Sequence, residues 1–255
     1  MVNLKAIYIL WLRDIKIFFR LKSKLISSLV MPVILLIVFS SGFRNMDIFH
    51  SYNKNIEYIQ FLVPALICMN LIFAATAAGI SVISDKNYGF LKEIMVAPVS
   101  RIAIVIGKIL GAASVALLKA IMLLIISFFI GFKIYSFLYL IPALIVMFLI
   151  SSIFIGLGLI LSSVIKDIYS FGLIINFIVY PLFFLSGAFF PLNNLSPALK
   201  FLAYLDPLTY GLDALRGTLI GVSAFPFYLN IIIVFVFSVL FTVLGAFFLS
   251  RTNPT

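Results

Sequence analysis

The side chains that could act as acids, nucleophiles or metal ligands are few in this sequence and do not cluster. The chain has one cysteine, Cys68, inside an apolar run, and one histidine, His50, which stands alone. A zinc site takes four ligands from Cys, His and carboxylates, and hydrolytic sites need a nucleophile with its base or a pair of acids. Neither set is present, so the sequence predicts no metal site and no catalytic residue on this chain.

Composition indicates a membrane protein. Of the 255 residues, 64% are hydrophobic and 10% are charged, whereas about a quarter of the residues in soluble domains are charged. The apolar runs are continuous and reach the roughly 20 residues that a helix needs to cross the hydrocarbon; they lack the alternation of a membrane β-barrel. The sequence therefore predicts an all-α, polytopic membrane protein forming a single domain over 1–255. Six transmembrane helices are expected at about 25–43, 57–83, 102–131, 138–164, 169–190 and 225–249.

The net charge of +10 fits this topology. Lys and Arg concentrate on the cytoplasmic side of membrane proteins, and most of them lie on one side if the N-terminus is inside. Both termini are thus predicted to be cytoplasmic, with the protein in the cell membrane. We interpret the basic excess as topology and contact with anionic lipid. Nucleic-acid binding is not expected, because no soluble domain is present to carry a basic patch.

Residues 1–24 are predicted to form an amphipathic helix in the plane of the lipid headgroups. The alternative is a simple basic flank of the first span. The expected apolar stripe is Leu4, Ile7, Tyr8, Trp11, Ile15, Phe18 and Phe19, and the opposite side carries Arg13, Lys16, Arg20 and Lys24.

Two connections between spans are long enough to hold structure of their own. In the cytoplasmic segment 84–101, residues 90–97 suit a short helix that Pro98 ends, and Ser100 can cap the next helix. Its apolar face either lies on lipid or docks into a groove of a soluble partner. The outer segment 191–224 contains Ser-Pro and Asp-Pro starts. They predict helices at 197–205 and 207–220, a hairpin that dips into the outer leaflet against protein.

The outer segment resembles the signature of ABC-2-type permeases, the membrane subunits of one class of ATP-binding-cassette exporters. The matching stretches are SGAFFP at 186–191, LDPLTY at 205–210 and ALRG at 214–217. The cytoplasmic segment is similar to the same family in its acidic-basic pair at 85–86 and in Gly89, Leu91, Glu93, Val96, Pro98, Ser100 and Arg101. The resemblance covers nearly the whole chain.

The resemblance implies that the cytoplasmic helix couples the permease to an ATPase subunit. The residues expected to make this contact are Gly89, Phe90, Leu91, Glu93, Ile94, Pro98 and Arg101. The sequence has no G-x-x-x-x-G-K-[ST] phosphate loop, so ATP and magnesium are expected on the partner subunit and no cofactor on this chain. The resemblance also implies a dimer of two permease copies, expected to be a homodimer.

In relatives the second and fifth spans line the translocation path. Here they offer Asn70, Phe73, Thr76, Asn176, Tyr180 and, where the exit narrows, Phe184. The alternative for the polar residues is hydrogen bonding between helices without substrate contact. Lys108 is expected to extend to the inner surface. Lys119, within the third span, either extends outward or pairs with Asp206 or Asp213, or it handles an anionic substrate.

The function implied is export of an amphipathic drug, lipid or lipid-linked compound, driven by the partner ATPase. A polysaccharide or lipo-oligosaccharide exporter is the alternative within the class. An ion-coupled secondary transporter is disfavoured because the acidic residues lie near the loops or in the N-terminal helix, not at mid-membrane.

Overall fold

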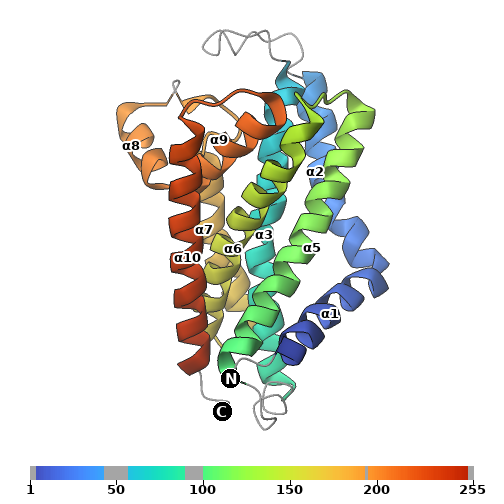
Figure 1. The fold of residues 1–255 in the computed structure, drawn as a ribbon, viewed down its shortest axis with the longest axis vertical. Coiled ribbons are helices and arrows are strands. Elements are labelled where there is room, and N and C mark those ends of the chain that lie inside the picture. The colour runs from blue at the N-terminus through green and yellow to red at the C-terminus, as the bar shows by residue number, and fades with distance from the viewer. Residues whose placement is uncertain (1–3, 43–56, 90–99, 193–194, 252–255) are drawn as a thin grey trace.

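The computed structural model of the chain describes residues 4–42, 57–89, 100–192 and 195–251, and its regular structure there is helical (Figure 1). Six segments are long and apolar enough to cross a membrane. The predictions of an all-α protein and of six spans are therefore confirmed. The elements are α1 (Leu4–Arg20), α2 (Lys22–Gly42), α3 (Tyr58–Asn87), α5 (Arg101–Ile130), the 3₁₀ turn η2 (Phe137–Tyr139), α6 (Leu140–Val164), α7 (Ile168–Leu185), α8 (Pro197–Leu205), α9 (Pro207–Ile220) and α10 (Phe227–Arg251).

The second span, α3, lies at the centre of the bundle. It packs on α2, α5, α6, α7 and α9. In its membrane-spanning part 67% of the residues are buried, compared with 17% in the spanning parts of α2 and of α10. Small residues permit this close packing between apolar helices. A Cβ on Gly158 of α6 would lie 2.4 Å from the carbonyl oxygen of Ala75 in α3. The backbones of α3 and α6 are therefore in direct contact.

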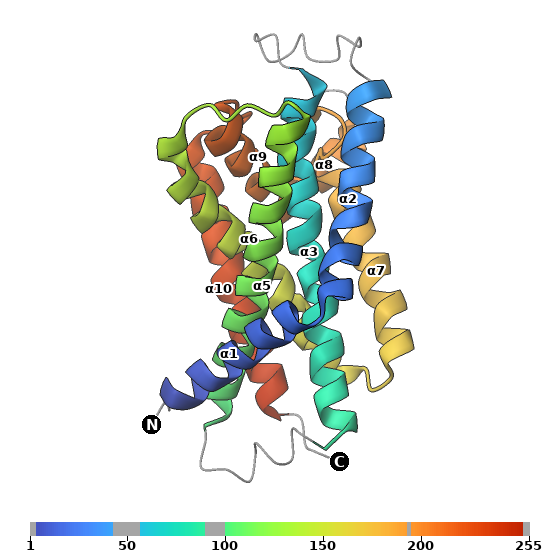
Figure 2. The ribbon, with the colours of Figure 1, turned by 90° about the vertical axis from the view of Figure 1, so that its right-hand side faces the viewer.

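The two ends of the bundle differ. Figures 1 and 2 show α1 lying obliquely across the end at which α10 finishes, and α8 and α9 at the opposite end. We call these the α1 end and the α8–α9 end. Helix α1 lies and α10 ends at the same end of the bundle, which is what an even number of crossings requires.

The hairpin helices α8 and α9 have the bounds that the sequence predicts. The Asp206 carboxylate accepts a hydrogen bond of 2.9 Å from the N–H of Leu208 and so caps α9. Ser196 precedes α8 but makes no side-chain cap bond. Proline at the first helical position sets both starts, since it lacks the N–H that would be unpaired there.

The fifth span is shorter than the predicted 169–190, because α7 ends at Leu185. Gly187 has φ +77°, a conformation that favours glycine and stops a helix. The guanidinium of Arg216 donates to the carbonyls of Gly187 and Ala188 at 3.0 and 3.1 Å. A buried arginine from α9 thus satisfies the backbone of the turn that ends α7.

Candidate functional site

Four of the six residues predicted for a translocation path line one cavity of about 630 Å³. Asn70 and Phe73 come from α3, and Tyr180 and Phe184 from α7. The rings of Phe73 and Tyr180 meet edge to face, with centroids 5.7 Å apart. The remaining lining residues are Ser28, Met31, Pro32, Leu35, Phe39, Met69, Lys119, Phe183, Phe189 and Phe190.

The cavity lies on α3 between α2 and α7, and its walls are mainly apolar. Met31 on one side and Tyr180 and Phe184 on the other are exposed, so it is open toward the surface of the bundle. Its size falls within the range of pockets that hold drug-sized ligands, about 300–1,000 Å³. Such a cavity is suited to an amphipathic molecule.

The other two predicted path residues, Thr76 and Asn176, do not line this cavity. The hydroxyl oxygen of Thr76 and the amide oxygen of Asn176 are buried and have no hydrogen-bond partner within the described ranges. The alternative role of hydrogen bonding between helices is therefore not seen for these two atoms.

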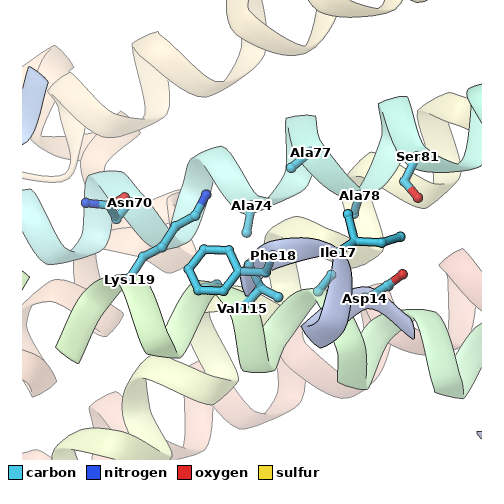
Figure 3. A pocket seen from close by; sticks show the side chains of 12 residues that line it. Asp14, Ile17, Phe18, Asn70, Ala74, Ala77, Ala78, Ser81, Val115 and Lys119 are labelled. Carbon is cyan, nitrogen blue, oxygen red and sulfur yellow. The ribbon is translucent and has the colours of Figure 1, made fainter. Parts of the chain in front are cut away.

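A second, smaller cavity of about 120 Å³ shares Asn70 and Lys119 with the first and is lined by α1 as well. Figure 3 shows alanines of α3 on one side and Phe18 of α1 projecting into it, with Asp14 at its far end. Lys119 from α5 reaches across toward α3 beside Asn70 (Figure 3). Its ammonium lies 6.0 Å from the centroid of the Phe18 ring.

The alternative in which Lys119 pairs with Asp206 or Asp213 is not borne out, because the hydrogen bonds of these two carboxylates are made within the α8–α9 end. The Asp213 oxygens accept from the backbone N–H groups of Ala224 and Phe225 and from the Asn230 amide. Asp206 caps α9 as described, and its second oxygen has no hydrogen-bond partner in the described residues.

Charged residues near the α1 end form a partly buried network. Lys108 of α5 contacts the Asp85 carboxylate in α3, and Arg13 of α1 binds Asp85 at 3.3 Å and Asp14 at 3.1 Å. The prediction that Lys108 extends to the membrane surface is wrong, since it is 4% exposed. Asp85, near the end of α3, lies within reach of Lys108, so the lysine pairs with this carboxylate inside the bundle and does not extend to the surface.

Helix α1 packs on α5 with part of the predicted stripe, together with Leu10, which lies outside that stripe. Leu10 and Phe18 are buried, while Leu4, Tyr8 and Phe19 are exposed. Two glycines of α5, Gly107 and Gly111, let this face of α1 approach closely. A Cβ added to Gly107 would lie 2.9 Å from Leu10, and one added to Gly111 would lie 2.7 Å from Asp14. Trp11 adds a hydrogen bond of 3.0 Å to Ser114 of α5.

Most of the predicted coupling residues fall outside the described ranges. These are Phe90, Leu91, Glu93, Ile94 and Pro98. The flanks are described: Gly89 follows α3 with φ +78°, and Arg101 begins α5. The Ser100 hydroxyl accepts from the N–H of Ala103 at 3.3 Å, which confirms the predicted cap of the third span.

The α8–α9 end is held by buried polar groups, among them Asp206, Asp213 and Arg216. The Arg216 guanidinium lies 3.5 Å from the centroid of the Phe61 ring in α3, a cation–π geometry. Burial raises the pKa of the Asp206 carboxyl from its ordinary 3.8 to about 7, against a smaller lowering by the Leu208 N–H. The sequence signal for Asp206 and Arg216 is that they lie in the stretches LDPLTY and ALRG, which resemble the family signature.

Comparison with known proteins gives a consistent result. The model of the ABC-2 type transporter family matches residues 5–220. The chain is 29% identical to "Inner membrane transport permease YadH" of Escherichia coli K12, over 97% of this chain and 92% of that protein. It is 25% identical to "Putative transport permease ycf38" of Cyanophora paradoxa, over 79% and 70% of the two chains. It is also 25% identical to "Nodulation protein J" of Rhizobium leguminosarum bv. viciae, over 78% and 76%.

Proposed function

Because the chain belongs to the ABC-2 type transporter family and is a membrane permease subunit without an ATPase domain, we propose that it forms the path of an ATP-driven exporter for an amphipathic compound. The cavity between α2 and α7 carries the proposal: it lies within the spans, has apolar walls and is open toward the surface of the bundle. An amphipath can enter such a cavity sideways from lipid without crossing water. The name of the Escherichia coli relative supports placement in the cell membrane.

A separate ATPase subunit would drive the transport cycle. ATP binding would favour one of two conformations of the permease, which is a biased two-state equilibrium. The segment 90–97 is proposed to form the contact, with Leu91 and Ile94 as apolar anchors and Glu93 fixing the register. Helix-in-groove contacts depend on a few large side chains, so losing two anchors should release the ATPase.

The test is co-purification of the permease with a candidate ATPase subunit from the same organism, followed by substrate-stimulated ATP hydrolysis. The variant Leu91→Ala/Ile94→Ala should retain less ATPase or lose stimulation. A matched control is Leu138→Ala/Ile141→Ala, which removes two exposed apolar side chains at the α8–α9 end and should behave like the wild type. Equal ATPase retention, stimulation and transport in both variants would contradict the coupling role.

Two copies of the permease are proposed to enclose the path, with α7 at their interface. Tyr180 is 44% exposed on α7, so a cysteine there is available to a second copy. In a Cys68→Ala background, single cysteines at Asn176 or Tyr180 should cross-link two permeases in at least one nucleotide state. Absence of cross-links at both positions in every state would place the interface elsewhere.

The membrane orientation is proposed to be cytoplasmic at the α1 end. Helix α1 would lie in the headgroup plane, and α8 and α9 would dip into the outer leaflet. A cysteine at Asn194 should then react with an impermeant maleimide in intact cells, and one at Asn87 should not. The reverse labelling pattern would overturn this topology.

A further inference from the structure

Two residues stand where the two cavities of the bundle meet. Among the described residues, the linings of the larger and the smaller cavity share Asn70 and Lys119 and no others. The larger cavity extends from them to the aromatic residues that follow α7, and the smaller one extends to Asp14 of α1. These two side chains therefore face both cavities.

Lys119 holds its ammonium inside the bundle. It lies eleven residues before the end of α5 at Ile130, which is about 17 Å along a helix that rises 1.5 Å per residue. The side chain does not run along α5 toward that end; it crosses toward α3, beside Asn70 and Ala74 (Figure 3). Cationic side chains kept within a membrane bundle commonly mark the route of a substrate or ion.

Asn70 offers a second hydrogen-bond donor at the same place. Its side chain is 7% exposed, and its amide nitrogen has no hydrogen-bond partner in the described residues. Burying an amide N–H without an acceptor costs about 1–3 kcal/mol of stability. A ligand that supplies an acceptor for the Asn70 amide would therefore offset this cost. An ammonium and an amide N–H together fit a group that only accepts hydrogen bonds.

The remaining polar groups favour an anion as well. Within the described part of the chain, no acidic side chain lines the larger cavity. Ser28 there donates its hydroxyl hydrogen to the carbonyl of Leu25. Asp14, the carboxylate that the described residues contribute to the smaller cavity, lies at its far end and is bound by Arg13 at 3.1 Å. The apolar walls of the larger cavity are suited to a hydrocarbon chain, not to a free inorganic anion.

We propose that Lys119 and Asn70 bind the anionic headgroup, a phosphate or carboxylate, of the transported amphipath while its apolar chain lies in the larger cavity. This inference rests on the proposed function and narrows its substrate class to anionic amphipaths. Lys119 sets the charge preference, and Asn70 adds a directional hydrogen bond.

The test measures equilibrium binding of radiolabelled dodecyl phosphate to the permease–ATPase complex in nanodiscs of zwitterionic lipid, with empty nanodiscs subtracted. Lys119→Met, which keeps length and removes charge, should weaken binding at least tenfold, and Lys119→Arg should stay within threefold of the wild type. Asn70→Leu should weaken binding at least threefold. The matched control is Lys133→Met, which removes an exposed lysine just beyond α5 and should leave affinity unchanged.

Two competitors identify which part of the ligand is recognised. Dodecyltrimethylammonium has the same chain with a cation and should not displace dodecyl phosphate. Inorganic phosphate has the anion without the chain and should need at least a hundredfold higher concentration. Equal competition by inorganic phosphate would overturn the amphipath, and equal competition by the cation would overturn the anion preference.

The outcomes separate this inference from the exporter itself. Unchanged dodecyl phosphate affinity in Lys119→Met overturns the headgroup site, while ATP hydrolysis that amphipaths still stimulate would leave the exporter in place. If the wild-type permease retains no ATPase, the proposed function fails. The binding difference between the wild type and Lys119→Met, measured on the permease alone, then still decides the headgroup site.

Discussion

Replacing Asp85 by Asn removes the carboxylate that contacts the buried Lys108 in the partly buried network at the α1 end. Lys108 is 4% exposed and Asp85 16% exposed in their side chains, so water screens their interaction little. With Asn at position 85, the ammonium of Lys108 keeps its buried site without the carboxylate that now contacts it. Leaving one charge of a buried pair without its partner costs about 3–5 kcal/mol.

The lower figure, about 3 kcal/mol, suits this site because the Ser81 hydroxyl lies 3.4 Å from Lys108 Nζ and remains as an acceptor. For a chain of this length, 1 kcal/mol shifts the melting midpoint by roughly 2–4 °C. Asp85→Asn should therefore melt roughly 6–12 °C below the wild type. Lys108→Met alone should cost less, because Arg13 still pairs with Asp85 at 3.3 Å.

The chain provides its own reporter for this measurement. Cys68 is the single cysteine and is 0% exposed in the centre of α3, so a fluorogenic maleimide should react only as the bundle unfolds. The double variant Asp85→Asn/Lys108→Met removes both charges and should recover most of the loss. Glu57→Gln is the control, since Glu57 flanks the same helix, is exposed and makes no side-chain cap bond. A midpoint for Asp85→Asn equal to that of Glu57→Gln, or no recovery in the double variant, would refute the reasoning.

Three further predictions use the same thiol-reactive melting measurement. The folded-state pKa of Asp206, about 7, lies above its ordinary 3.8, so ionisation of Asp206 lowers the stability of the fold as pH rises from about 4 to about 7. Asp206→Asn should therefore raise the melting midpoint at pH 8, change it little at pH 4 and flatten the dependence of the midpoint on pH. An unaltered pH dependence in this variant would contradict the raised pKa. Arg216→Lys should lower stability by about 2 kcal/mol, because lysine lacks the planar fork that bonds two carbonyls and stacks on Phe61; a midpoint equal to the wild type would show that this geometry contributes nothing. Gly158→Ala should lower stability by about 1–3 kcal/mol, because the added methyl group would overpack against the backbone of α3. Gly172 has open space around it, so Gly172→Ala should be neutral or stabilising by up to about 1 kcal/mol. Similar effects of the two alanines would refute the close contact of α6 with α3.

The sequence alone determined the class of fold and several element bounds, because these depend on local properties. Continuous apolar runs require helices in a membrane, since each backbone group must be bonded within its own segment. The Ser-Pro and Asp-Pro starts set α8 and α9, and Ser100 sets the start of α5. Each of these signals acts over a few neighbouring residues, so no knowledge of the packed structure was needed.

Tertiary structure decided which helix faces meet, and with them the candidate site. Helical spacing assigns residues to one face, but the rotation of each helix follows from its partners, as the glycines of α5 show by burying Leu10 in place of Tyr8. The same applies to charges: Lys108 pairs with an acid 23 positions earlier, and Lys119 turns toward α3. The number of residues between two positions on different helices does not tell how far apart their side chains lie in space. The meeting of Asn70 with Lys119 therefore arises from packing, because only the packed bundle fixes how α3 and α5 are rotated against each other.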